Sequence, residues 1–389
     1  MRNLGAYEEL LYWSAARHLI EQERMTIIYI DPDQSEIWLE SSTSANKVVR
    51  LALTSMTWCN LLVKDIEQTT VFGENTRKTL RKNSLNIVNV YFTPALPVDD
   101  CSDVMASPAS FRSTIVESFI LDTPSYGEKL PQLRESLGFE LPEAPFPGDD
   151  NEVKAAYVRH AALSTAFQEI KKEQNVFEAG RPFFTYIFLF VQIGMFFLLE
   201  MNGGSQNFHT LIKYGAKYNP LIEDGEWWRL FLPMFLHIGL LHLLTNSLSL
   251  YYIGTAVERI YGNVRFILIY LFAGFLGFLA SFVFNTSLSA GASGAIFGCF
   301  GALLYFGLLQ PKIFFRTMGY NIILLVVINL GIGFTLAVVD NSGHIGGLIG
   351  GFLAAAIVRT PREAKKLTTQ VPALAATAAI VWALISKGY

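Results

Sequence analysis

The tetrapeptide GASG at Gly291–Gly294 begins one apolar segment of this chain, and HIGG at His344–Gly347 begins another about fifty residues later. Each motif puts one reactive side chain, Ser293 or His344, at the head of its segment. Ionisable groups inside a membrane are costly, and they are functional candidates by default. A serine and a histidine at matching depths therefore suggest a hydrolase that works inside the bilayer.

Seven apolar runs in the second half of the chain determine the fold class. They cover residues 183–201, 230–253, 265–285, 293–309, 319–338, 344–358 and 371–386. Each has roughly 15 to 24 residues, and about 20 are needed to cross the hydrocarbon core as a helix. Only helices and closed barrels satisfy the backbone in lipid, and runs this long and continuous indicate helices. We expect a polytopic α-helical membrane protein with seven crossings.

The charges divide the chain into two parts. The whole chain has 51% hydrophobic residues, 16% charged residues and a net charge of −3. From Gly180 onward there are 13 Lys and Arg against 7 Asp and Glu, whereas the residues before it have 17 against 26. This asymmetry indicates two environments. Charged side chains interrupt residues 1–20, so no signal peptide is predicted, and we expect the N-terminal part to stay in the cytoplasm.

The basic residues predict the orientation, because Lys and Arg collect on the inner side of membrane proteins. With residues 1–180 inside, the inner flanks carry Arg181, Arg259, Arg265, Lys312, Arg316, Arg359, Arg362, Lys365 and Lys366, and the outer flanks carry Lys213, Lys217, Arg229 and Lys387. This distribution puts the C-terminus outside and Ser293 and His344 near the outer face. Glu258, on the inner side, is expected to cap or pair near a helix end.

Glycines at four-residue spacing accompany both motifs. They are Gly294 and Gly298 in one segment, and Gly343, Gly347 and Gly351 in the other. Small residues at this spacing let two helix backbones approach closely, although the same spacing also occurs in ordinary helix packing. The serine and the histidine at the two helix heads favour a contact in which Ser293 hydrogen-bonds His344.

A third apolar segment carries further polar groups, in HIGLLHLLTN at His237–Asn246. Trp228 and Arg229 precede it, and GTAVERIYG at Gly254–Gly262 follows it. With the serine and histidine motifs, this set resembles the rhomboid family of intramembrane serine proteases, because five separated motifs occur in the family's order. The resemblance covers roughly residues 181–389 and implies a six-helix core, here followed by one C-terminal helix. It says nothing about residues 1–180.

The resemblance implies a catalytic dyad. Ser293 would be the nucleophile, and His344 the general base that takes its proton and later returns it to the leaving amine. Asp340 lies four residues before His344, but it is left out because the family uses a Ser/His pair. The expected partners are the lipid bilayer and transmembrane protein substrates. No cofactor and no metal are expected at this site.

His242 and Asn246 are four residues apart and so share one helix face. Both can donate to an oxyanion, and acyl transfer needs donors where that charge develops. By resemblance they form the oxyanion hole with the backbone N–H of Ser293. Supporting roles by resemblance fall to His237, Gly291, Gly294, Trp228 and Arg229. Taken singly, a histidine can be a packed residue, and a tryptophan at this depth can be a membrane anchor.

The first 180 residues predict a compact α/β domain. Strands are expected at 26–31 and 35–40 around a turn at Asp31–Gln34, and again at 47–54, 85–93 and 114–121. Helices are expected at 57–83 and 152–178, with a loop at Pro142–Asp150. The stretch contains no P-loop, dinucleotide fingerprint or zinc spacing. Its acidity argues against nucleic acid as a partner.

We expect residues 1–180 to regulate the membrane part or to recruit substrate. A group of acidic residues could bind a divalent cation or simply form a solvated surface; it comprises Asp31, Asp33, Asp99, Asp100 and Asp103. Three cysteines, Cys59, Cys101 and Cys299, are too few and too scattered for a disulfide framework or a cysteine-based metal site, and are expected to pack.

Two functions of different class remain. The first is a serine endopeptidase that cuts transmembrane segments of other proteins. The second is a non-catalytic rhomboid-like scaffold or adaptor that binds membrane proteins in quality control, for disposal by others. The intact Ser293 and His344 favour the first, because non-catalytic relatives lack such a pair. A transporter is less favoured, because the sequence contains no inverted repeat.

Overall fold

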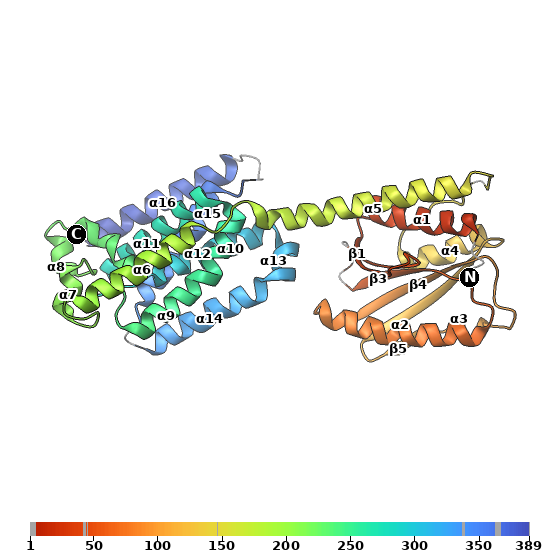
Figure 1. Cartoon of the computed structure of the whole chain (residues 1–389), viewed down its shortest axis with the longest axis horizontal. Helices are drawn as coiled ribbons and strands as arrows, with labels where there is room; N and C mark the ends of the chain where they lie inside the picture. The colour runs from red at the N-terminus through yellow and green to blue at the C-terminus, as the bar shows by residue number, and fades with distance from the viewer. Residues whose placement is uncertain are drawn as a thin grey trace. The chain divides into compact units, whose positions relative to one another are not determined.

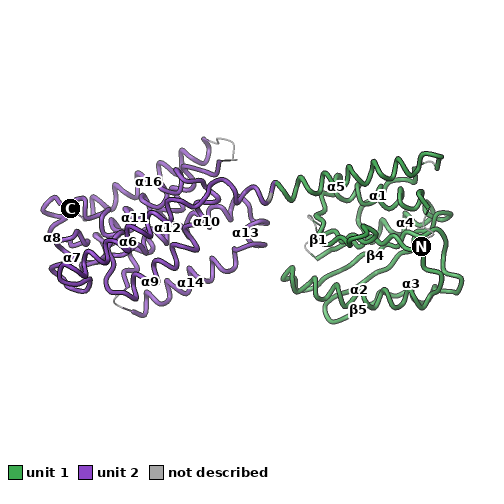
Figure 2. Tube along the Cα trace, viewed as in Figure 1, with its two compact units in different colours: residues 1–171 green, residues 172–389 purple. Residues whose placement is uncertain are grey.

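The computed structural model describes residues 5–41, 44, 46–145, 147–336, 339–361 and 367–388. The chain forms two compact units, residues 1–171 and residues 172–389 (Figure 2). Three of the basic residues used for the orientation, Arg362, Lys365 and Lys366, lie outside the described residues. Each unit has its own hydrophobic core.

The first unit contains a six-stranded sheet with the order β1-β2-β3-β4-β6-β5. The strands are β1 Thr26–Ile30, β2 Glu36–Glu40, β3 Lys47–Leu53, β4 Leu85–Thr93, β5 Ala109–Phe111 and β6 Thr114–Asp122. Strands β1, β2 and β3 form an antiparallel meander, whereas β3, β4 and β6 are parallel. The central strands β3 and β4 are almost continuously buried, as expected for strands covered on both faces.

Helices cover both faces of this sheet (Figure 1). On one face lie α1 Ala6–Glu21, α4 Tyr126–Leu137 and the first part of α5 Asn151–Asn175; on the other lie α2 Cys59–Thr79 and the short α3 Ser102–Ala106. The predicted strands and the helices near 57–83 and 152–178 are therefore confirmed to within a few residues. Helices α1, α3 and α4 and strand β5 were not predicted.

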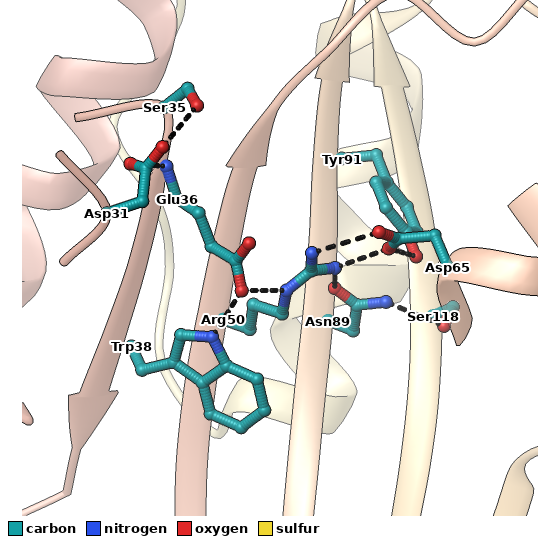
Figure 3. Close-up of polar contacts among 9 residues, drawn as sticks. All are labelled: Asp31, Ser35, Glu36, Trp38, Arg50, Asp65, Asn89, Tyr91 and Ser118. Carbon is teal, nitrogen blue, oxygen red and sulfur yellow. Dashed lines mark hydrogen bonds and ion pairs between the residues drawn. The ribbon is translucent and has the colours of Figure 1, made fainter. Parts of the chain in front are cut away.

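A buried arginine joins β3 to its neighbours (Figure 3). Arg50 donates to Glu36 on β2 at 2.9 Å, to Asp65 on α2 at 2.7 Å and to Asn89 on β4 at 2.9 Å. Burial disfavours its charge, but the hydrogen bond to Glu36 and the charge of Asp65 together raise the pKa of Arg50 above its ordinary value. Tyr91 completes the network by donating to Asp65 at 2.6 Å. Because its donors and acceptors satisfy one another, the network stabilises this unit rather than forming an open site.

The expectation for the cysteines needs a correction. Cys59 and Cys101 form a disulfide across a sequence separation of 42 residues, with their Cα atoms 5.6 Å apart. Cys59 begins α2 and Cys101 precedes α3, and the backbone N–H of Cys59 also binds Asp99 at 2.7 Å. The fold therefore brings together two cysteines that are far apart in the sequence. Cys299 is a buried free thiol, as expected for a packing residue.

The second unit is helical. Its elements are η1 Val176–Glu178, α6 Phe184–Met201, α7 Phe208–Lys213, α8 Asn219–Glu223, η2 Trp227–Leu230, η3 Leu232–Phe235, α9 Leu240–Ser249, η4 Leu250–Gly254, α10 Thr255–Tyr261, α11 Asn263–Phe284, α12 Ser293–Leu309, α13 Pro311–Thr317, α14 Gly319–Thr335, α15 Asn341–Val358 and α16 Leu367–Gly388. Figure 1 shows α12 lying among the other long helices, and most of its side chains are buried.

Among the described residues, four helices are long and apolar enough to cross a membrane: α6, α11, α15 and α16. The pair α13 and α14, bent by 72°, is a candidate fifth span, and α12 is an apolar helix just below this length. The predicted run 230–253 is not a single helix, because two short 3₁₀ turns precede α9. The helix then continues through a π turn from α9 into α10. All seven apolar runs are mainly helical, and the number of crossings stays a prediction.

Glu258 anchors the start of α6. Its fully buried carboxylate accepts hydrogen bonds from the backbone N–H groups of Phe183, Phe184 and Thr185 at 2.9 to 3.0 Å, and from the Thr185 hydroxyl at 2.7 Å. A helix start leaves such N–H groups unpaired and attracts negative charge. The expectation that Glu258 caps a helix end is therefore confirmed.

Candidate active site

Ser293 and His344 lie at the heads of two helices that pack closely together. Ser293 is the first residue of α12, and His344 is the fourth residue of α15. The two helices run in parallel: Gly294 lies against Gly343, and one turn later Gly298 lies against Gly347. A Cβ atom added to Gly347 would lie 2.0 Å from the carbonyl oxygen of Gly294. The predicted glycine contact is therefore present, and only small residues permit it.

This packing brings the two reactive side chains into contact. The Nε2 atom of His344 lies 2.9 Å from the Oγ atom of Ser293. That distance allows the imidazole to take the serine proton as the oxygen attacks a carbonyl carbon. The imidazole also stacks on Phe297, with ring centroids 4.3 Å apart and planes 13° apart. Phe297 follows Ser293 by four residues on the same helix face, a relation that the sequence contained but that we did not use.

Asp340 does not act as a third member of this pair. The Nδ1 atom of His344 is buried and has no hydrogen-bond partner in the described part of the chain. The Asp340 carboxylate instead accepts from the backbone N–H of Gly343 at 3.1 Å and from the hydroxyl of Ser281. It thus caps α15 and binds α11.

We call residues 285–293, which connect α11 to Ser293, the serine segment. Gly291 in this segment allows the ring of His242 to lie close to the backbone. Gly291 has φ +140°, and a Cβ atom there would lie 2.6 Å from Cε1 of His242. His242 therefore lies directly against the segment that leads into Ser293. Asn246, one turn further along α9, is buried and donates one amide hydrogen to the backbone carbonyl of His242 at 2.9 Å. The second hydrogen of this amide remains for another acceptor.

His237 lies beside His242 and contacts the residue before Ser293. It is fully buried, its Nε2 atom lies 3.5 Å from the backbone nitrogen of Ala292, and its ring centroid lies 5.3 Å from that of His242. The start of α12 has no side-chain cap, and a helix start presents free N–H groups and partial positive charge. The backbone N–H of Ser293 belongs to this first turn. A developing oxyanion would be stabilised at such a place.

Trp228 and Arg229 have a different role from the dyad residues. The guanidinium of Arg229 is buried, pairs with Glu226 at 2.6 Å and donates to the carbonyl of Ile212 at 2.8 Å and of Ala216 at 3.1 Å. It also lies 4.4 Å from the ring centroid of Trp228. These contacts fasten the loop between α6 and α9. Trp228 is about half exposed, as a membrane anchor would be.

Of the two alternatives for the acidic residues, a cation site has no counterpart in the described residues, where no group of three or more His, Cys, Asp and Glu side chains could hold a metal ion. The acidic side chains are used locally instead. Asp31 accepts from the backbone of Glu36 at 2.8 Å, and Asp99 binds Cys59.

Comparison with known proteins identifies the family. The model of the Rhomboid domain matches residues 224–361, which include the dyad and its neighbours. The chain belongs to the rhomboid family. It is 45% identical over 356 residues to the Rhomboid protease GluP of Bacillus subtilis (strain 168), a match that covers 91% of this chain and 70% of that protein.

Shorter matches fall on other members. The chain is 38% identical over 138 residues to the Putative rhomboid protease YdcA of Bacillus subtilis (strain 168), covering 35% of this chain and 69% of that protein. It is 44% identical over 149 residues to RHOMBOID-like protein 7 of Arabidopsis thaliana, covering 37% of this chain and 47% of that protein. These findings confirm the predicted family and fold class: a helical integral membrane protein with an N-terminal α/β region.

Proposed function

We propose that this chain is an intramembrane serine endopeptidase that hydrolyses peptide bonds in or near transmembrane segments of other membrane proteins. One observation carries the proposal: the Oγ of Ser293 and the Nε2 of His344 lie 2.9 Å apart at the heads of two parallel helices. A neutral hydroxyl is a weak nucleophile, and a base at this distance removes that limitation. Membership of a family that contains named proteases supports the same function.

In the proposed reaction, the Ser293 oxygen attacks the scissile carbonyl carbon while His344 takes its proton. The resulting oxyanion is held by the backbone N–H of Ser293 and by His242 and Asn246. His344 then gives the proton to the leaving amine, and water hydrolyses the acyl enzyme with His344 again as base. Gly291 and Gly294 leave room for these approaches, and His237 supports the serine segment.

We propose further that residues 1–180 lie in the cytoplasm, that the helices make seven crossings, and that the site lies near the outer face of a bacterial plasma membrane. This orientation rests on the distribution of basic residues. The N-terminal part is proposed to regulate cleavage or recruit substrate. An open cavity of about 820 Å³ lies between the β1–β2 turn and α5 and is lined by Asp33, Arg159 and His160 among others.

Cleavage of a model transmembrane substrate by purified protein tests the function. Ser293→Ala and His344→Ala should each abolish cleavage while the protein stays folded, because members of such a pair act as a unit. Thr245→Ala and His209→Ala are controls, since both side chains are exposed. Substantial cleavage by either dyad variant would favour the scaffold or adaptor instead.

A further inference from the structure

The carboxylate of Asp340 lies where the histidine helix α15 meets α11. It caps α15 by accepting the backbone N–H of Gly343 at 3.1 Å, and His344 follows in the next position. Its other oxygen accepts the hydroxyl of Ser281, a fully buried residue of α11. The α11 helix that carries Ser281 ends at Phe284, and the chain continues from there into the segment that leads to Ser293.

The same segment is held from its other side by a buried lysine. Lys217 is fully buried, and its ammonium donates to the carbonyls of Asn285 and Ser287, the latter at 3.0 Å. Its backbone forms a two-way bridge with Ser289, at 2.9 and 3.1 Å. Lys217 and Asp340 also attract each other electrostatically. A fully buried cation and a partly buried anion thus hold the end of α11 and the residues that follow it.

Neither charge touches the reacting atoms. The His344 imidazole is held by Ser293 and by stacking on Phe297, so its place relative to Ser293 depends on the height and rotation of α15. Contacts with α11 help to set them, in addition to the glycine contacts with α12: a Cβ atom at Gly346 would lie 2.5 Å from the Cβ of Ala280, and one at Gly277 would lie 2.8 Å from the carbonyl oxygen of Gly343. Asp340 binds both helices at this end.

We propose that Asp340, opposite the buried charge of Lys217, is a positioning residue that ties the histidine helix α15 to α11, whose end leads into the serine segment, and so sets the Ser293 to His344 distance. This inference rests on the proposed protease function. A displacement of about 1 Å at a reacting pair can cost about 100-fold in rate. Loss of the tie should therefore lower kcat and leave substrate binding almost unchanged.

The test compares Asp340→Ala, Asp340→Asn and Ser281→Ala in the full-length protein. Two rates are measured for each: cleavage of a model transmembrane substrate, and labelling of Ser293 by a fluorophosphonate. We expect Asp340→Ala to lower kcat and the labelling rate about 10- to 100-fold, with KM within about 2-fold. Asp340→Asn keeps one carbonyl oxygen and should recover part of the loss. Ser281→Ala removes the hydrogen bond between α11 and Asp340 but leaves the cap of α15 in place. Its kcat and labelling rate should lie between those of the wild type and Asp340→Ala.

Asn207→Ala is the matched control, because Asn207 caps α7 in the same way and binds neither dyad helix. It should lower the melting temperature slightly and leave kcat unchanged. If Asp340→Ala does not fold, Ser281→Ala decides, and an unchanged kcat and labelling rate in it overturns the proposal. A loss in Asp340→Ala that merely follows the folded fraction overturns it too. Cleavage by Ser293→Ala, or no cleavage by the wild type, would instead refute the protease function.

Discussion

At the scale of single residues, the site depends on positions where only one side chain fits. Gly291 combines φ +140° with a ring of His242 in the space that a Cβ would fill. The Ser293 and His344 pair and the residues of the third segment were evident from the sequence, because each stands out as a polar group in an apolar run. The roles of Ser281 and Lys217 were not evident, because they depend on tertiary contacts that no spacing encodes.

Gly291→Ala should lower kcat about 100-fold, because the new methyl group displaces His242 and the φ angle is unfavourable for alanine. Gly194→Ala in α6 is the control, since a Cβ there meets nothing within 4 Å. Kinetics of both variants on one substrate provide the comparison. Equal activities would mean that His242 need not stay where the structure has it.

Replacing the two side-chain oxyanion donors, Asn246 and His242, should lower the cleavage rate to different extents without abolishing it. Loss of one such donor costs about 100- to 1,000-fold in rate, so Asn246→Ala should cleave slowly but measurably. His242→Ala should be slower, because that side chain also packs against Gly291. The decisive readout is kcat under saturating substrate. Wild-type rates in both variants would make these residues structural only.

At the scale of helices, the glycine contact between α12 and α15 could be predicted because it is periodic. The start of α9 could not be predicted, because the apolar run begins ten residues earlier. Pro233 is the second residue of a short 3₁₀ turn, and Gly239 adopts φ +80° just before the helix. Hydrophobicity alone does not distinguish a turn that lies in the membrane from a helix that crosses it.

Glu258→Gln should destabilise the membrane unit. The carboxylate accepts from three backbone N–H groups and two side chains, and each buried donor left unpaired costs about 1 to 3 kcal/mol. Thermal unfolding in detergent should give a clearly lower midpoint than wild type. Glu223→Gln, at an exposed position of α8, should melt like the wild type. If the two variants melt alike, Glu258 does not anchor α6.

At the scale of the whole molecule, the sequence predicted a membrane part preceded by an α/β part. Helix α4 escaped prediction because Pro131 lies inside it, and proline normally ends a helix. The contact between Cys59 and Cys101 was not predicted, because the two cysteines meet only through the way the intervening strands and helices fold. Their separation of 42 residues does not by itself indicate a contact.

Truncation tests the proposed division into a regulatory and a catalytic part. Residues 172–179 belong to the membrane unit, where Phe177 lies 6.3 Å from Phe306 between ring centroids and Ala179 donates to the carbonyl of Arg259 at 2.8 Å. A chain starting at Lys172 should fold and cleave a model substrate, and one starting at Gly180 should melt at a lower temperature. A well-folded but inactive Lys172 truncation would mean that the first unit completes the active enzyme.

The central claim is that His344 activates Ser293 for covalent attack. Full-length protein in detergent is treated with a fluorophosphonate, and the modified residue is identified by peptide mass spectrometry. We predict one labelled serine, Ser293, with labelling lost in Ser293→Ala and strongly slowed in His344→Ala, while Thr245→Ala and His209→Ala label like the wild type. Labelling at another serine, or equal labelling of Ser293 with and without His344, would contradict the account.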